Sequence, residues 1–234
     1  MSDYTETYNS AANAAPADRA SFIRKTYAHL ALCLLAFIVV EAFLFASGAA
    51  YMMASVMFTG GSIGWLVVLG LFMGATWLAT SWANSETSRA TQYAGLGLYI
   101  LAESVIFVPL LLIVSIYAGG SVIVEAGIVS LGLFLGITAV PFLTRSDFSF
   151  LGPIIAIGGL AAFGAIIAGS IFGFGLGTFF AFAMVALAGS SILYQTSNII
   201  HRYRTDQYVA ASLGLFASIL LLFWYILRIF GSRR

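Results

Sequence analysis

Three glutamates stand inside long apolar runs of this sequence: Glu41 in "AFIVVEAFLF", Glu103 in "YILAESVIFVPLL" and Glu125 in "SVIVEAGIVS". No Lys or Arg lies at a matching position to pair with them, so at least one is expected to be protonated at neutral pH or to face water. A carboxyl group in such surroundings can take up protons or cations. Glu103 is the strongest candidate, because Pro109 removes a backbone donor six residues later and can bend a helix.

Two interpretations of these glutamates remain open. In the first, Glu103, together with Glu41, lines a proton- or cation-responsive cavity. In the second, protonated or water-bridged glutamates only pack. Glu125 lies a few residues from the end of its run, so we expect it to reach an aqueous interface.

A second concentration of polar residues is the stretch "ILYQTSNIIHRYRTDQ", residues 192–207. It places His201, Arg202, Arg204 and Asp206 within six residues, although only 8% of the chain is charged. Long apolar runs flank it, so it is either a working site or the wet turn between two helices. His201, like His29, can titrate near physiological pH, although a single histidine in a loop is usually only solvated.

Motifs for enzyme or metal chemistry are absent from the sequence. It has no HExxH motif, no Cys/His pairing and no Walker motif. Cys33 is the only cysteine, which excludes an intramolecular disulfide and a multi-cysteine metal site. The net charge of +1 gives no electrostatic basis for a nucleic-acid partner. We therefore predict a non-enzymatic protein without catalytic residues, cofactor or bound metal.

The elements that carry these residues must be membrane helices. Hydrophobic residues make up 61% of the chain and the mean hydropathy is +1.01, whereas an ordinary globular domain is roughly 45–50% apolar. Ten basic and nine acidic side chains could not cover such a core in water. The chain is therefore predicted to be an integral membrane protein.

Seven stretches are long and apolar enough to cross a bilayer as helices, because about 20 residues suffice. They cover residues 26–47, 61–83, 92–117, 121–143, 150–172, 176–199 and 208–230. We predict an all-α integral membrane protein, a seven-transmembrane-helix bundle forming a single domain over residues 21–234. Residues 1–20 are polar and lack the apolar region of a signal peptide, so they are predicted to form a disordered tail.

Basic residues gather in alternate joins between these spans. Seven precede the first span or follow the second, fourth and sixth: Arg19, Arg24, Lys25, Arg89, Arg145, Arg202 and Arg204. The other joins contain none, so the positive-inside rule predicts a cytoplasmic N-terminus. Seven spans then place the C-terminus outside, although it ends in "GSRR". Either the last segment is re-entrant or the early helices fix the topology, and the length of residues 208–230 favours the second.

The segment "ILYQTSNIIHRYRTDQYVAASLGLFASILLLFWYILRIFG" resembles the signature of the Bax inhibitor-1 (transmembrane Bax inhibitor motif) family. It is most similar to the bacterial YccA-like branch, which "FIRKTYAHLAL" and "LTRSDFSFLG" also resemble, and the similarity covers most of the chain. The resemblance implies a multi-pass protein of the bacterial inner membrane. It also implies a fold whose last helix is central, wrapped by the other six.

For the wider family the resemblance implies a pH-sensitive calcium leak, governed by two acidic residues on helices six and seven. Those positions fall on Gln195 and Ser218 here, and neither side chain can share or release a proton. A leak gated by an acidic pair is therefore not expected. Glu103 could take over part of the role, a hypothesis that rests only on its depth in the membrane.

The YccA-like branch implies modulation of the membrane-anchored AAA protease FtsH, and so a role in membrane-protein quality control. We take this as the leading prediction, with the polar tail as a cytoplasmic handle for the protease. The alternative is a leak for Ca²⁺, other cations or protons. Its ion-path or pH-sensing candidates are Glu103, Gln195, Ser218, Glu41 and His201. That alternative requires Glu103, Gln195 and Ser218 to converge on one cavity.

Overall fold

The computed structural model describes residues 10–86 and 88–232, and this part of the chain forms eight helices. Their bounds are α2 (Pro16–Ala46), α3 (Ala49–Thr59), α4 (Gly61–Ala83), α5 (Arg89–Tyr117), α6 (Gly120–Thr144), α7 (Leu151–Phe172), α8 (Gly177–His201) and α9 (Tyr208–Gly231). All but α3 are long and apolar enough to cross a membrane. The predicted all-α bundle of seven spans is confirmed, and each observed span ends within about two residues of its predicted end.

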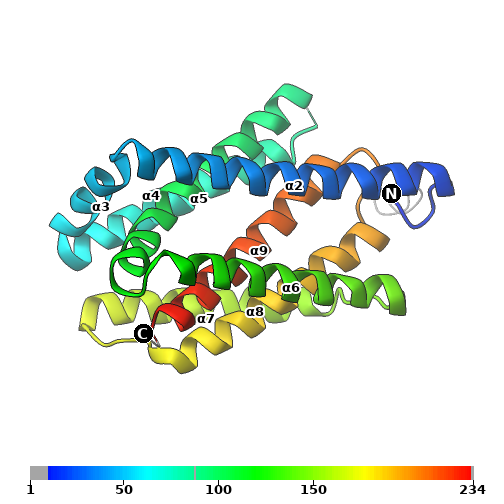
Figure 1. Cartoon of the computed structure of the whole chain (residues 1–234). Helices are drawn as coiled ribbons and strands as arrows, with labels where there is room; N and C mark the ends of the chain where they lie inside the picture. The colour runs from blue at the N-terminus through cyan, green and yellow to red at the C-terminus, as the bar shows by residue number, and fades with distance from the viewer. Residues whose placement is uncertain (1–9, 87, 233–234) are drawn as a thin grey trace.

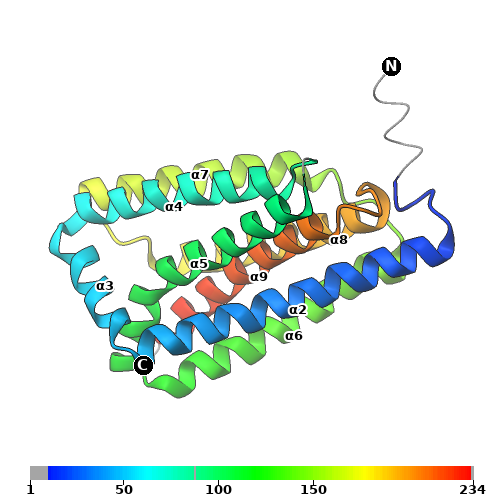
Figure 2. The ribbon, with the colours of Figure 1, turned by 90° about the horizontal axis from the view of Figure 1, so that it is seen from above.

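The last helix lies at the centre of the bundle, as predicted. In Figure 1, α9 is visible between α2 and α6. Figure 2 shows three layers, in which α5, α9 and α8 lie between α4 with α7 on one side and α2 with α6 on the other. The most apolar window of α9 is 72% buried, against 6% for α4 and for α7. α9 packs on α2, α4, α5, α6 and α8, while α7 packs on α8 and α4.

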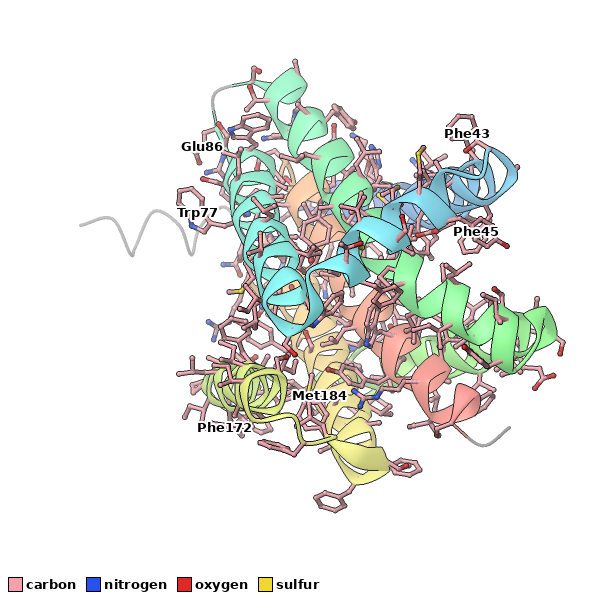
Figure 3. The ribbon with its side chains drawn as sticks, turned by 90° about the vertical axis from the view of Figure 1, so that its left-hand side faces the viewer. Phe43, Phe45, Trp77, Glu86, Phe172 and Met184 are labelled. Carbon is pink, nitrogen blue, oxygen red and sulfur yellow. The ribbon has the colours of Figure 1, made fainter. Side chains whose placement is uncertain are left out.

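Small residues allow this central position. Without a hydrophobic drive between helices in lipid, close backbone approach has to supply the packing. The buried face of α9 accordingly carries Ala210, Ala211, Ser212 and Ser218 beside larger apolar side chains. The outer helices instead present large apolar side chains to the surroundings, and Figure 3 shows Phe43, Trp77 and Phe172 pointing away from the bundle.

The N-terminal region differs from the expectation for residues 1–20. Residues 1–9 lie outside the described residues, and α2 begins at Pro16, before the predicted domain boundary at residue 21. Proline suits this position, because the first turn of a helix does not use its backbone N–H. The basic residues that follow therefore lie on a helix that continues directly into the first span.

The join between the first two spans contains a short helix, α3, that the sequence did not predict. Gly48 adopts φ 78°, a left-handed conformation that ends α2 and starts α3. α3 buries Ala50 and Ala54 against Val108 and Leu112 of α5. Eleven apolar residues are too few to cross a bilayer, but they suffice to cover the end of a neighbouring span.

Both ends of the bundle can be told apart by their charge. The start of α2 and the α8–α9 turn lie at one end, while α3 and the end of α9 lie at the other (Figures 1 and 2). The first end, called the basic end below, carries Arg19, Arg24, Lys25, Arg89, Arg145, Arg202 and Arg204. α9 runs the length of the bundle, which does not fit the re-entrant alternative.

Candidate functional site

Gln195 and Ser218, the positions that the family resemblance assigns to the acidic pair, lie on α8 and α9, and each contacts the other helix at a different residue. Gln195 lies against Gly214, where an added Cβ would come within 2.8 Å of the Gln195 Oε1 atom. Ser218, one turn further along α9, donates a hydrogen bond to the Gly214 carbonyl oxygen at 2.9 Å. Its Oγ also lies 2.8 Å from the Oγ of Ser191. Ser218 is thus satisfied by α8 and by its own helix.

Gln195 is less well satisfied than Ser218. Its Oε1 atom is buried and accepts no hydrogen bond from the described residues. The side chain fills the space above Gly214 by shape rather than by polar bonding. At these two positions the interface is therefore a packed contact between two helices, because neither Gln195 nor Ser218 changes charge near neutral pH.

Glu41 and Glu103 lie on α2 and α5, and each residue is only 7% exposed. The Tyr99 hydroxyl, one turn earlier on the same helix, lies within reach of the Glu103 carboxyl group. Neither carboxyl oxygen of Glu41 has a hydrogen-bond partner among the described residues. A buried polar group without a partner is costly, so Glu41 is the least satisfied carboxyl group in the spans that the structure describes.

An aromatic layer separates the two buried glutamates. The rings of Phe37 and Phe107 meet edge to face at 5.1 Å, and Phe216 of α9 lies 6.3 Å from Phe37. Glu41 follows Phe37 by one turn, whereas Glu103 precedes Phe107 by one turn. Because α2 and α5 run in the same direction (Figure 2), the carboxyl groups lie on opposite sides of this layer.

The structure does not bring the ion-path candidates together. Three of the cavities among the described residues are an apolar groove of about 650 Å³ between α3, α4 and α5, and two pockets of about 390 and 450 Å³ at the basic end. Glu41, Glu103, Gln195 and Ser218 line none of the three. Of the five predicted candidates, only His201 lines one of them, the 450 Å³ pocket.

At the basic end, the α8–α9 turn (residues 202–207) connects several distant segments. The Arg204 guanidinium binds Glu86 of the α4–α5 join at 2.7 Å and Asp206 at 2.8 Å. Arg89 donates to the Asp206 carbonyl oxygen at 2.7 Å and stacks over the Tyr208 ring at 4.9 Å. These bonds fix the turn against the start of α5.

The α6–α7 join reaches the same region from the other side. Asp147 lies 3.8 Å from Arg202 and accepts a hydrogen bond from Ser197 at 3.2 Å. The backbone N–H of Ser149 also donates to it, and these contacts hold the pKa of Asp147 below its usual range. The His201 Nδ1 lies 3.0 Å from the Ser197 carbonyl oxygen, which orients its ring.

The described part of the N-terminal segment also contacts this turn. Ala11 donates a backbone hydrogen bond to the Tyr203 carbonyl oxygen at 2.8 Å, and Ser10 forms an isolated antiparallel bridge with Arg204. Ala11 is fully buried. The α8–α9 turn therefore binds segments from three other parts of the chain.

The sequence places Arg202 and Arg204 of "HRYRTD" in a join between two spans, but it does not identify these partners. Glu86, Arg89, Asp147 and Ser197 were not chosen as candidates. A signal for them existed, because each lies in or beside a join that also carries the clustered basic residues. Asp147 belongs to "LTRSDFSFLG", which had been noted only for its resemblance.

Fold and site together define a multi-pass α-helical membrane protein with a central last helix and an interlocked basic end. Comparison with known proteins agrees with this class. A family model described as "Inhibitor of apoptosis-promoting Bax1" matches residues 19–234. The chain therefore belongs to the Bax inhibitor-1 family.

Individual relatives come from bacteria, yeast and plants. An uncharacterized Pseudomonas aeruginosa protein is 34% identical over 169 residues, covering 70% of this chain and 73% of the relative. Bax inhibitor 1 of Schizosaccharomyces pombe is 34% identical over 116 residues, covering 47% of this chain and 42% of its own length. Protein LIFEGUARD 4 of Arabidopsis thaliana is 33% identical over 128 residues, covering 50% and 49%.

Proposed function

We propose that this protein is a non-enzymatic regulator in a bacterial inner membrane, which modulates membrane-protein quality control by contact with the AAA protease FtsH. The observation that carries the proposal is that Glu103, Gln195 and Ser218 line none of the three cavities. A conducting path would need polar groups that converge on a water-accessible space. The accessible polar surface is instead at the basic end.

The choice of partner rests on the resemblance to the YccA-like branch. The bacterial relative, 34% identical over 169 residues, supports a bacterial setting. The gathering of basic residues at one end supports a cytoplasmic N-terminus by the positive-inside rule. In that orientation the N-terminal segment lies on the side from which an AAA protease engages a membrane protein.

Affinity purification from native membranes tests the proposal directly. The tagged full-length protein is expected to co-purify FtsH, and the turnover of an FtsH substrate is expected to change when the protein is overproduced. Co-purification at the level of an unrelated seven-span protein, together with unchanged turnover, would contradict the proposal.

Two truncations test the N-terminal handle. Removing residues 1–9 leaves the Ala11 and Ser10 contacts with the α8–α9 turn in place, whereas removing residues 1–15 deletes them. If residues 1–9 are the handle, the shorter truncation is expected to lower co-purification on its own. Unchanged binding and turnover in both truncations would rule the handle out.

A pH-sensitive calcium or cation leak is the second candidate, and Glu41 is the observation that favours it. Its buried carboxyl group has no partner among the described residues, as expected of a group kept for a role other than packing. Calcium flux into proteoliposomes should then fall in Glu41→Gln and Glu103→Gln but not in Glu125→Gln, on the exposed face of α6. Equal flux in all variants removes both buried glutamates from consideration.

A further inference from the structure

The 450 Å³ pocket at the basic end lies where α2, α6 and α8 meet, and it is called the interfacial pocket below. Arg19 of α2, Arg145 at the end of α6 and His201 at the end of α8 contribute its basic side chains. Pro141, Phe142 and Ile200 contribute its apolar wall. Basic groups from three helices therefore share one space with apolar side chains.

The interfacial pocket differs from the 390 Å³ pocket at the same end in its balance of charges. The two arginines of the 390 Å³ pocket, Arg89 and Arg204, are matched by Glu86 and Asp206, and Arg204 binds both acids directly. The interfacial pocket is lined by no carboxylate. Among the described residues, neither Arg19 nor Arg145 forms an ion pair within 4.0 Å. The two arginines of this pocket thus have no direct carboxylate partner in the part of the chain that the structure describes.

Arg145 is placed there by an uncommon backbone conformation. It adopts φ 56° at the end of α6, a left-handed position where glycine is the usual residue. It is also the only described residue other than glycine with a positive φ. The chain therefore presents a guanidinium at a point where the backbone alone would favour glycine.

Hydroxyl groups lie one helical turn deeper in the bundle. Thr138 precedes the pocket residue Phe142 by one turn of α6, and Thr196 precedes Ile200 by one turn of α8. The Tyr27 hydroxyl lies within reach of both threonine hydroxyls, and its ring packs 6.1 Å from Phe142. All three hydroxyls are buried, and the side-chain partners within reach of the Tyr27 hydroxyl are these two threonines. A group of buried hydroxyls thus lies one helical turn behind the basic pocket.

We propose that the interfacial pocket binds the phosphate group of an anionic phospholipid, such as phosphatidylglycerol. Guanidinium groups pair with phosphate oxygens through two parallel hydrogen bonds, which favours arginine over a point charge. Thr144 is the last residue of the α6 span, so Arg145 lies at the level where lipid headgroups are expected. Phe142 and Leu143 are exposed there and can contact the acyl chains. This binding requires neither a protease nor ion flow, so it goes beyond the proposed function.

The test measures lipid binding to the full-length protein in an uncharged detergent, by native mass spectrometry and by the shift in melting temperature. The added probes are phosphatidylglycerol, phosphatidylcholine with the same acyl chains, and inorganic phosphate. Wild type is expected to retain phosphatidylglycerol preferentially. R19Q/R145Q is expected to bind it at least about tenfold more weakly, because two charge-assisted hydrogen-bonding groups are lost.

R24Q/K25Q is the matched control, since it also removes two positive charges from the basic end, but from residues outside the pocket. It is expected to bind phosphatidylglycerol like wild type. Equal weakening in both double variants would mean diffuse attraction and would overturn the proposal. Equal binding of phosphatidylcholine, or equal stabilisation by inorganic phosphate, would overturn the assignment to an anionic lipid. If R19Q/R145Q does not fold, R145K replaces it: weaker phosphatidylglycerol binding than in R24K is expected, and identical binding would contradict the proposal.

Discussion

At the basic end, charged side chains bind one another across the chain, whereas the two buried glutamates of the spans, Glu41 and Glu103, lie singly on separate helices. Arg204 illustrates the first region, because it joins Glu86 and Asp206 while its backbone pairs with Ser10. Glu41 illustrates the second region, because both of its carboxyl oxygens are buried without a partner among the described residues.

The difference follows from the two environments. Near water, an exposed ion pair contributes little, so many weak contacts have to act together to fix a loop. Within the bundle, each unsatisfied polar atom is costly on its own. The network at the basic end is therefore expected to stabilise the fold. An isolated buried polar group in a span is expected to destabilise the fold and to be retained for a function. Four predictions test this comparison, from the largest expected effect to the smallest.

The largest effect is expected where helix packing supports the basic end. At Gly95 of α5, an added Cβ would lie 2.5 Å from the Ala79 carbonyl oxygen and 2.7 Å from the Ala83 backbone nitrogen of α4. Gly95→Ala should separate these helices and lower the unfolding free energy by roughly 1–3 kcal/mol. Denaturation in detergent micelles measures it. Gly97→Ala is the control, because an added Cβ there meets no atom within 4 Å, and it should change the unfolding free energy little. An equal loss of unfolding free energy in both variants would contradict a specific contact between Gly95 and α4.

Removing a buried carboxyl group that has no hydrogen-bond partner should raise the unfolding free energy, whereas Gly95→Ala lowers it. Glu41→Met is expected to stabilise the protein by roughly 1–3 kcal/mol, because methionine leaves no unsatisfied polar atom in apolar surroundings. Glu103→Met should gain less, since the Tyr99 hydroxyl lies within reach of the Glu103 carboxyl group and methionine removes that polar neighbour. Unfolding of both variants in the same detergent gives the comparison. A destabilised Glu41→Met, or equal gains in both, would show that hydrogen bonding does not distinguish the two sites.

Breaking the network at the basic end should cost less than the packing change. Arg204→Gln is expected to lower the unfolding free energy by about 1 kcal/mol, as it removes two partly exposed ion pairs. A double-mutant cycle with Glu86→Gln separates the Glu86 pair from the rest. Arg24→Gln, an exposed arginine of the same end, should stay within about 0.5 kcal/mol of wild type. A loss in Arg24→Gln as large as in Arg204→Gln would mean that net charge, and not pairing, is responsible.

The sequence predicted the spans well and the contacts between distant joins poorly. Hydropathy located all seven spans, because crossing a bilayer requires a minimum length of apolar helix. The central position of α9 followed from the family resemblance, and its small residues give the physical reason. α3 was missed because an eleven-residue apolar helix does not meet the length criterion.

The ion pairs at the basic end could not be predicted from the sequence for a different reason. Glu86 and Arg204 are 118 positions apart in the chain, and nothing in either local segment identifies the other as its partner. The family resemblance singles out Gln195 and Ser218, but it does not identify their neighbours, because the hydrogen bond between Ser218 and Ser191 depends on the rotation of α8 against α9. Such rotations are set by packing, which the one-dimensional pattern does not encode.

The smallest expected effect is the pH dependence that Asp147 contributes. Its pKa is lowered in the folded protein, first by the Ser149 backbone N–H and then by Ser197 and Arg202. A lowered folded pKa means that Asp147 stabilises the fold above the unfolded pKa of about 3.9, and that this contribution is lost as the pH falls through the folded value. Since the side chain is 49% exposed, the contribution should stay below about 1 kcal/mol. Melting curves of wild type and Asp147→Asn should therefore differ near neutral pH and converge below the folded pKa; a difference that is constant with pH would mean that shape, and not charge, makes the contact.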